Sequence, residues 1–335
     1  MPSPSNQLPG SPVLSSAQMH CVKPNKPVIG YVTESWVCSR SQSPNIVRHV
    51  GIDVTGTPLA GKFIAGQSFG VIPVGLDKNG KPHKVRLYSI ACSSKGEDGK
   101  GGVLSTTVKR LIEEHKPQHS SDHEDQHDLF LGICSNQLCD LKIGAPVNVS
   151  GPNGRRFVLP ENRELHDYLF VATGTGIAPF RGMIQELFPQ SGDVTERQVH
   201  LVMGVPYSTD LLYHDEFCRY AAQYDNFHYH IAVSRERPDG WQSDGPGRGI
   251  YVGQAIELRW DLIGPMLEQE GTLIYVCGIE GMQLGIFQSL VRHGLEASYL
   301  DLKDDLRSTP YQDWTVEQVR RMARPTSRCM LEVYD

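Results

Sequence analysis

The chain has 335 residues, enough for two domains with separate cores, and 39% hydrophobic and 21% charged residues are typical of a globular protein. Its net charge of −6 argues against a general nucleic-acid-binding protein. The absence of any run of 18 apolar residues argues against a membrane span. The eight cysteines include no C-x-x-C pair, so we expect no metal centre of the usual zinc or iron–sulfur spacing.

The first 22 residues are rich in serine and proline and carry neither a basic nor an apolar region of the kind found in a signal peptide. We expect them to form a disordered tail. Scattered cysteines in a chain without a secretory signal favour reduced thiols in a cytoplasmic setting. A plastid location or an association with a membrane stays open.

The first half of the chain predicts an antiparallel β-barrel. Short segments rich in β-branched residues are separated by turn sequences such as Asp77–Gly80 and Gly151–Gly154, a pattern typical of barrels. One helix is expected near Asn136–Asp140. The predicted strands are Pro27–Thr33, Val47–Val54, Ser68–Ile72, Lys84–Ile90 and Val147–Ser150.

The second half predicts a parallel sheet wound with helices, because strand-like and helix-like segments alternate along it. The boundary between the two halves is expected in the polar stretch Leu159–His166, which gives domains of residues 23–162 and 163–335. The expected strands are Tyr168–Ala172, Val199–Met203, Tyr229–Val233 and Leu273–Cys277. The expected helices are Pro179–Leu187, Leu211–Gln223, Gly253–Glu268 and Gly281–His293.

Four histidines occur at a spacing of four in the segment Glu113–Asp128, at positions 115, 119, 123 and 127. That spacing is compatible with a metal site on a helix. The interspersed Pro117, Ser120 and Ser121 make a stable helix unfavourable, so we favour a mobile, solvated loop over a metal site.

The segment Tyr168–Arg181 carries the clearest functional signal. An apolar strand ends in Thr173-Gly174-Thr175-Gly176, and Pro179 suits the first turn of the helix that follows. Such a connection seats a phosphate on free backbone N–H groups at a helix N-terminus. The third glycine of the dinucleotide fingerprint is missing, so a plain tight connection is an equal alternative for this segment alone.

Other segments are each ambiguous when taken singly. Arg86 and Tyr88 share one face of a predicted strand, which suits a phosphate beside a flat ring but also an ordinary surface pair. Gly132–Asn136 is a turn into a helix start, and Ser234-Arg235 after a strand could grip a phosphate monoester or form a charged turn. Cys277 ends a strand where open α/β sheets bind ligands, although a lone cysteine is often a small buried hydrophobe.

Taken together and in order, these segments resemble the plant- and cyanobacterial-type ferredoxin–NADP reductases. The resemblance covers nearly everything after residue 22, without shuffling. Its segments are Val22–Pro27, Ile64–Ser68, Asp77–Pro82, Arg86–Ser89, Cys134–Leu141, Gly151–Gly154, Gly174–Arg181, Gly204–Pro206, Leu211–Tyr213, Ser234–Glu236, Cys277–Met282 and Leu331–Tyr334.

The resemblance implies an N-terminal antiparallel β-barrel that binds FAD, followed by a C-terminal α/β domain with a parallel sheet that binds NADP(H). It assigns Arg86 to the flavin diphosphate, Tyr88 and Ser89 to the flavin ring, and Leu87 to the FAD site. The ribityl chain and diphosphate would contact a second set, which comprises Thr107, Val108, Lys109, Ile133, Cys134 and Ser135.

The same resemblance assigns an NADP site and a reaction centre to the second half. Thr175 would lie at the nicotinamide end and also touch the flavin. Ser89, Cys277, Glu332 and Tyr334 would form the catalytic set, with Tyr334 covering the flavin ring and Cys277 acting without covalent chemistry. The remaining NADP contacts would be Val205, Pro206, Ser234, Arg235, Tyr251, Gly278 and Ile279.

The sequence departs from the family at three positions. Glu113 stands where the family has a tyrosine against the FAD adenine, and Arg248 is spaced one residue differently from Tyr251. Asp335 follows the terminal aromatic Tyr334. These departures leave the hold on adenine and the access of nicotinamide as open questions.

The implied activity is hydride exchange between NADP(H) and FAD coupled to one-electron exchange with ferredoxin. A reductase for flavodoxin or an oxygenase partner is the nearest alternative, and a non-catalytic flavin sensor is disfavoured because the catalytic set is present. Lys62, Lys81, Lys84 and Lys95 could dock an acidic, transiently bound partner, or they could be scattered solubility charges.

Overall fold

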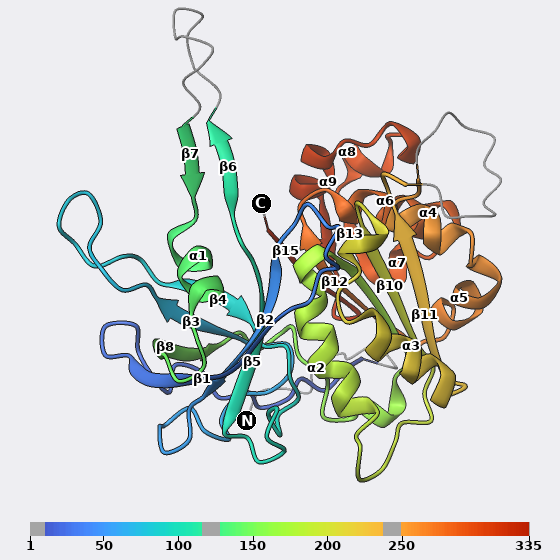
Figure 1. Cartoon of the computed structure of the whole chain (residues 1–335). Coiled ribbons are helices and arrows are strands. Elements are labelled where there is room, and N and C mark those ends of the chain that lie inside the picture. The colour runs from blue at the N-terminus through green and yellow to red at the C-terminus, as the bar shows by residue number, and fades with distance from the viewer. Residues whose placement is uncertain (1–10, 116–127, 237–248, 335) are drawn as a thin grey trace, which may run out of the picture. The chain divides into compact units, whose positions relative to one another are not determined.

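The computed structural model describes residues 11–115, 128–236 and 249–334 (Figure 1). Two compact units are distinguished, of which one spans residues 17–154 and the other combines residues 11–16 with 155–334. The units divide after Gly154, a few residues before the predicted boundary at Leu159–His166. Each unit is described by itself below.

Residues 11–22 are ordered, whereas the sequence predicts a disordered tail there. Leu14 forms a β-bridge with Pro160, and the Ser15 hydroxyl donates to the Leu159 carbonyl at 2.6 Å. Val22 is buried and forms a bridge with Gly151. A serine- and proline-rich segment is ordered here because its backbone groups find partners beside existing strands. Residues 1–10 lie outside the described part of the chain.

The N-terminal unit is the predicted antiparallel barrel. Its six-stranded sheet has the order β4-β3-β8-β1-β2-β5, and the two edge strands meet through a bridge between Ile90 and Thr106. The Thr106 hydroxyl reinforces this closure by donating to the Ser89 carbonyl at 2.7 Å. The strands are β1 (Val28–Val37), β2 (Val47–Asp53), β3 (Ser68–Ile72), β4 (Arg86–Ser89), β5 (Val103–Lys109) and β8 (Pro146–Asn153).

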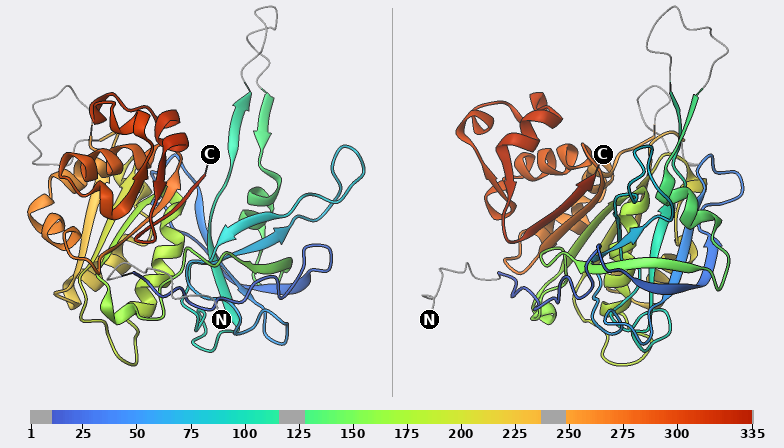
Figure 2. Two further views of the ribbon diagram at one scale, coloured as in Figure 1. Left: turned by 180° about the vertical axis from the view of Figure 1, so that it is seen from behind. Right: turned by 90° about the vertical axis from the view of Figure 1, so that its left-hand side faces the viewer.

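Every second side chain along these strands points into the barrel. Inward residues such as Val50, Ile52 and Leu104 form one apolar core with Phe69. The predicted helix is present as α1 (Ile133–Asp140) and begins three residues earlier than expected, with Leu138 packing into that core. Strands β6 (Ile112–His115) and β7 (Asp128–Leu131) pair as a separate hairpin, which projects from this unit in both views of Figure 2.

The C-terminal unit is the predicted parallel sheet. Its five strands run in the order β11-β10-β9-β12-β15, and every neighbouring pair is parallel. They are β9 (Tyr168–Thr173), β10 (Val199–Val205), β11 (Phe227–Val233), β12 (Leu273–Ile279) and β15 (Cys329–Tyr334). Strands β9, β10 and β12 contain almost only buried residues, as expected for strands covered on both faces, whereas the edge strand β11 is only partly buried.

Helices cover both faces of this sheet (Figure 1). On one face Phe180 of α2 (Ile177–Leu187) stacks on Phe170 of β9, and α3 (His214–Gln223) packs near β11. The opposite face packs against three helices, namely α4 (Val252–Glu257), α5 (Trp260–Leu267) and α6 (Met282–Arg292).

Three further features differ from the sequence expectations or were not foreseen. Strand β5 was not predicted, because its buried residues include the polar Ser105 and Thr106 and its end, Thr107–Lys109, was assigned to cofactor contacts. The expected helix Gly253–Glu268 is two helices, since Arg259 leaves helical geometry with φ −119° and ψ 21°. Residues 294–325 form unpredicted short elements, which are α7 (Glu296–Tyr299), β13 (Leu300–Leu302), α8 (Asp304–Arg307), α9 (Val316–Met322) and β14 (Ala323–Pro325).

Short 3₁₀ turns complete the connections, at Arg163–Leu165, Gly174–Gly176, Ser208–Asp210 and Tyr311–Asp313. No helix in the described ranges combines the length and the apolar character needed to cross a membrane.

Candidate functional site

The strand order places a topological switch point at the carboxyl end of β9. From β9 the chain winds outward through β10 to β11, and then returns to β12 on the other side of β9. Ligands of open α/β sheets bind in the crevice where the winding direction reverses. The residues at the carboxyl ends of β9 and β12 are therefore the first candidates for a binding site.

The Thr173–Gly176 connection occupies this point. Strand β9 passes through a 3₁₀ turn, Gly174–Gly176, directly into α2, and Pro179 lies in the first turn of that helix as predicted. No side chain caps either start, which leaves backbone N–H groups at the switch point. Gly176 is required by space, because a Cβ there would lie 2.2 Å from the Cys277 carbonyl oxygen.

Thr173 ties the two loops together, a role that sequence reasoning missed. Its hydroxyl oxygen accepts a hydrogen bond from the Ile279 N–H at 3.0 Å. Gly278 has φ +149°, and a Cβ on it would lie 2.0 Å from that same oxygen. Gly278 and the exposed Ile279 are thus held beside the switch point.

The structure brings together three of the four predicted catalytic residues, with Thr175 beside them. Cys277 and Glu332 are direct neighbours in the register of β12 and β15. Two residues farther along β15, the Tyr334 hydroxyl is 2.9 Å from the Thr175 hydroxyl. A residue pair 159 positions apart in sequence therefore closes the cluster. Ser89, the fourth catalytic candidate, belongs to the other unit.

Burial favours the neutral forms of this cluster. Desolvation raises the pKa of Glu332 to about 7, so that its carboxyl titrates near neutrality. Burial first, and the neighbouring Glu332 second, raise the pKa of the Cys277 thiol well above its usual value. Burial therefore favours the protonated thiol of Cys277 at neutral pH, and a protonated thiol is a poor nucleophile.

A second group lies at the carboxyl ends of β10 and β11. The Ser234 N–H donates to the Val205 carbonyl at 3.0 Å, and the Arg235 N–H donates to the Pro206 carbonyl at 2.9 Å. Tyr251 begins α4 nearby and is 65% exposed, which leaves its ring free to stack. These five residues were predicted to contact the diphosphate and the 2′-phosphate of NADP(H), and all of them lie at this edge of the sheet. They are Val205, Pro206, Ser234, Arg235 and Tyr251.

Arg235 is exposed, and its guanidinium lies 5.9 Å from the centre of the Tyr207 ring. Gly249, which sequence reasoning also missed, lets the returning chain approach β11 closely. A Cβ at this position would lie 1.8 Å from the Val233 carbonyl oxygen. Arg248 and Asp335 lie outside the described residues, as do residues 116–127 of the histidine-rich segment. The ends of that segment, Glu113–His115 and Asp128, belong to β6 and β7 and not to the predicted loop.

In the N-terminal unit, the end of β4 and the start of α1 gather the other predicted residues. The Tyr88 ring packs near Phe69, and a hydrogen bond joins its side chain to Cys134, with the charge of Arg86 close by. Desolvation, the largest cause, raises the pKa of Tyr88 and of the Cys134 thiol. Leu87 points the other way and is 59% exposed, as strand alternation predicts.

The start of α1 suits an anionic group. Gly132 precedes the helix and offers no side-chain cap, and the first turn contains no acidic residue. The exposed Arg86 guanidinium and the N–H groups of Ile133–Ser135 form a donor set of the kind that a diphosphate needs. Thr107 and Val108 are buried in β5, whereas Lys109 at its end is exposed.

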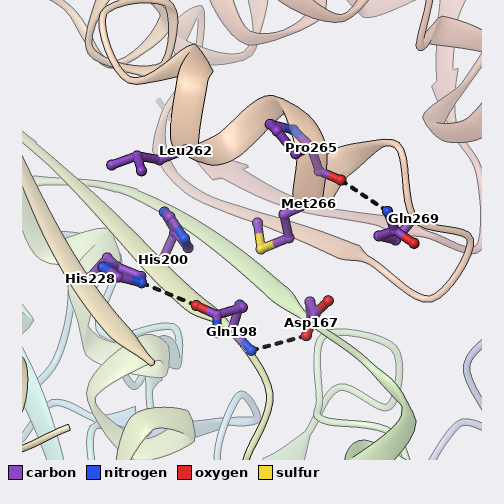
Figure 3. A pocket seen from close by; sticks show the side chains of 8 residues that line it. All are labelled: Asp167, Gln198, His200, His228, Leu262, Pro265, Met266 and Gln269. Carbon is purple, nitrogen blue, oxygen red and sulfur yellow. Dashed lines mark hydrogen bonds between the residues drawn. The ribbon is translucent and has the colours of Figure 1, made fainter. Parts of the chain in front are cut away.

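A separate pocket of about 340 Å³ lies away from these residues, near the amino ends of β10 and β11 (Figure 3). His200 and His228 face it from neighbouring strands, and burial lowers the pKa of His200 to about 3. The pocket is at the wrong end of the parallel strands for the predicted nucleotide site. Its lining residues are Asp167, Gln198, His200, His228, Leu262, Pro265, Met266 and Gln269.

Comparison with known proteins agrees with this geometry. Residues 170–286 match the family model described as an oxidoreductase NAD-binding domain. The chloroplastic leaf isozyme 1 of ferredoxin–NADP reductase from Oryza sativa subsp. indica is 34% identical over 88% of this chain and 77% of its own length. Ferredoxin–NADP reductase from Spirulina is 34% identical over 80% of this chain and 87% of its own.

Among solved structures, ferredoxin–NADP+ reductase from Plasmodium falciparum superposes with a TM-score of 0.65 at 22% identity. The match covers 94% of this chain and 99% of that one, which supports the fold.

The chain combines a β-barrel with a parallel sheet that matches an NAD-binding domain, and a thiol, a carboxyl and a phenol lie at the switch point of that sheet. These features define a two-domain pyridine-nucleotide oxidoreductase. The coverage and identity of the curated relatives make the assignment specific. The chain belongs to the ferredoxin–NADP reductase family.

Proposed function

We propose that this chain is an FAD-dependent ferredoxin–NADP+ reductase that exchanges a hydride with NADP(H) and single electrons with ferredoxin. The observation that carries the proposal is the convergence of Thr175, Cys277, Glu332 and Tyr334 at the switch point of a chain from this family. FAD, when bound, supplies the conversion between a hydride and two single electrons. The side chains supply binding, orientation and protons.

For FAD, we propose that Arg86 and the first-turn N–H groups of α1 hold the diphosphate, since both offer donors without a competing carboxylate in that turn. Tyr88 and Ser89 would line the flavin ring. Thr107–Lys109 would contact the ribityl chain.

For NADP(H), we propose that Ser234, Arg235 and Tyr251 select the 2′-phosphate and adenine. Arg235 offers an always-charged planar donor set for the phosphate, and the exposed Tyr251 ring offers a stacking surface. Val205 and Pro206 would line the path of the diphosphate. Gly278 and Ile279 would contact the nicotinamide half, where the absence of a Cβ at Gly278 permits close approach.

At the reaction centre, the Cys277 thiol stays protonated and fills space beside the nicotinamide without forming a bond to it. Glu332 can hold or release a proton near pH 7 and can accept a hydrogen bond from the carboxamide in its ionised form. Ser89, in the N-terminal unit, is a further proposed contact of the nicotinamide. The Tyr334 ring is two-fifths exposed at the end of β15 and would cover the flavin until nicotinamide displaces it.

Purification followed by a dye assay tests this function. We expect a yellow protein that releases FAD on denaturation and reduces ferricyanide with NADPH much faster than with NADH. A colourless protein that takes up no added FAD would contradict the proposal.

Ferredoxin is the proposed partner because the curated relatives are named for it. A flavodoxin, or a dedicated oxygenase component, is the second candidate, since an exposed lysine set can attract any acidic carrier in a transient complex. Steady-state reduction of a ferredoxin and a flavodoxin in parallel distinguishes them. We further propose a reducing compartment, either the cytoplasm or a plastid, because all eight cysteines are free thiols.

A further inference from the structure

The outer face of the barrel carries a histidine between two carboxylates that the reductase function does not use. His49 and Gly51 on β2 alternate with the core residues Val50 and Ile52, so they face away from the core. Glu34 on β1 is paired with Gly51, and Glu97 reaches the same place from the loop before β5. Three segments far apart in sequence thus meet at one ring nitrogen.

The side chains of this group are held in place before any ligand arrives. His49 is 1% exposed and stacks on the Trp36 ring at a centroid distance of 5.0 Å. The Ser105 hydroxyl donates to the Glu97 Oε1 atom at 2.6 Å. Gly51 gives Glu34 room to lie across β2, because a Cβ there would be 2.6 Å from the Glu34 Cγ.

The distances within this group also match the spacing of metal ligands. The His49 Nε2 atom makes a long hydrogen bond of 3.3 Å to Glu34 Oε1 and lies 3.5 Å from Glu97 Oε1. A charge-assisted N–H···O bond is normally about 2.8 Å long, and a single N–H cannot point at both oxygens. Ligands about 2.0–2.1 Å from a tetrahedral zinc ion are themselves about 3.3–3.4 Å apart.

The three ligand atoms lie within 4.8 Å of one another. Two carboxylates meet at this place, and one divalent cation balances the charge of a carboxylate pair. Glu34 is 38% exposed at its side chain, so an ion can enter from solvent and keep a water molecule as its fourth ligand.

We propose that Glu34, His49 and Glu97 form a zinc-binding site on the outer face of the barrel. The ion would join β1, β2 and the loop before β5, and it would stabilise this unit by binding the folded state alone. The site goes beyond the reductase function and takes no part in electron transfer.

Zinc binding to the full-length flavoprotein tests the proposal directly. After removal of metals with a chelator, titration calorimetry with Zn²⁺ should reveal one equivalent that is lost in His49→Gln. Because His49 is buried and its replacement can impair folding, Glu97→Gln provides a second variant of nearly identical shape. It should weaken that equivalent by at least about tenfold while keeping the FAD content and the NADPH–ferricyanide rate of the wild type.

Two other groups can bind zinc and need controls. The histidines at 119 and 123 lie in the histidine-rich segment, and Cys218 lies 3.6 Å from His214 on α3. The variants His119→Gln/His123→Gln and Cys218→Ser should both retain the equivalent that Glu97→Gln weakens. Zinc should also raise the Tm of the wild type but not of Glu97→Gln.

Equal zinc uptake and an equal shift in Tm for the wild type and Glu97→Gln would overturn the proposal and leave a plain ion-paired histidine. Loss of the equivalent in either control variant, with Glu97→Gln unaffected, would place the zinc elsewhere and overturn it as well. Since activity is measured separately, neither result bears on the reductase function.

Discussion

Glu332 sits in the register of two parallel strands opposite Cys277, and burial shifts both side chains toward their neutral forms. The shift matters most for Glu332, because its pKa of about 7 falls where the cell operates. One carboxyl can therefore present a proton or a negative charge at the proposed nicotinamide site with little change in pH. The identity of this residue was predictable from the C-terminal pattern, but its titration was not, since that depends on burial by residues distant in sequence.

Glu332→Gln should abolish the pH dependence of the preference for NADP+ over NADPH. Below pH 7 the carboxyl is neutral, and above pH 7 it is negative and favours the positively charged ring of NADP+ over the neutral ring of NADPH. In the wild type, the ratio of the Kd for NADPH to the Kd for NADP+ should rise severalfold between pH 6 and pH 8. Glu332→Gln should show a flat ratio, as measured by difference spectroscopy of the flavin. A ratio that rises equally in both proteins would assign the effect to another group.

Replacing Arg235 by alanine should change the choice between the two nicotinamide coenzymes. Its guanidinium is exposed at the end of β11 and is proposed to pair with the 2′-phosphate, which NADH lacks. The KM for NADPH should rise by at least about tenfold, because a charge-assisted pair is worth about 1.5–3 kcal/mol. The KM for NADH should stay within twofold and serves as the internal control. Ser234→Ala should act in the same direction, and equal effects on both coenzymes would contradict the assignment.

At the scale of elements, the connections after β9 and β12 form the site because their glycines permit contacts that side chains would block. Gly176 lies against the Cys277 carbonyl and Gly278 lies against Thr173. The sequence predicted a glycine loop at this place, although the segment lacks the third glycine of the dinucleotide-binding fingerprint. The structure supplies the reason for these glycines, which is the close packing of two loops separated by about a hundred residues.

Gly176→Ala should damage the site more than Gly174→Ala does. A Cβ at position 176 would meet the Cys277 carbonyl oxygen at 2.2 Å, and moving that strand end costs about 1–3 kcal/mol. A Cβ at position 174 would meet nothing within 4 Å, although its φ of +53° is mildly strained for alanine. The KM for NADPH should therefore rise strongly only in Gly176→Ala, with a lower Tm. The same loss in both variants would show that backbone strain, not the loop contact, governs the site.

Elements with strong local patterns were predictable, and those that depend on context were not. The buried strands and most helices of the C-terminal unit follow from apolar runs and periodicity. Strand β5 escaped because its buried residues include Ser105 and Thr106, which the closed barrel satisfies with hydrogen bonds to Glu97 and Ser89. The helix break at Arg259 was likewise not predictable, because no glycine or proline stands at that position.

For the whole molecule, the change from an all-β pattern to alternating strands and helices predicted the fold of the two halves, and the ordered series of motifs predicted the family. Single motifs were ambiguous. Local sequence could not show the site of Glu34, His49 and Glu97, since its three ligands come from separate segments and only the barrel's register joins them.

The exposed lysines of the N-terminal unit give a prediction about partner docking. Lys62 and Lys95 lie near each other, because Gly101 hydrogen-bonds to both Gly61 and Lys95. Lys62→Glu/Lys95→Glu should raise the KM for ferredoxin severalfold at low salt, while the NADPH–ferricyanide rate stays constant. The double variant Lys142→Glu/Lys303→Glu changes net charge equally at other exposed positions and should have little effect. Equal effects of the two double variants would show that ferredoxin binding depends on net charge and not on the positions of Lys62 and Lys95.

The most direct test of the central claim is anaerobic reduction of a ferredoxin by NADPH in the presence of the purified, FAD-loaded protein. We predict that the ferredoxin absorbance bleaches at a rate proportional to the amount of protein, and that Glu332→Gln with Cys277→Ala slows this by orders of magnitude without loss of FAD. A wild-type protein that binds FAD and NADPH yet passes no electrons to any ferredoxin or flavodoxin offered would contradict the account.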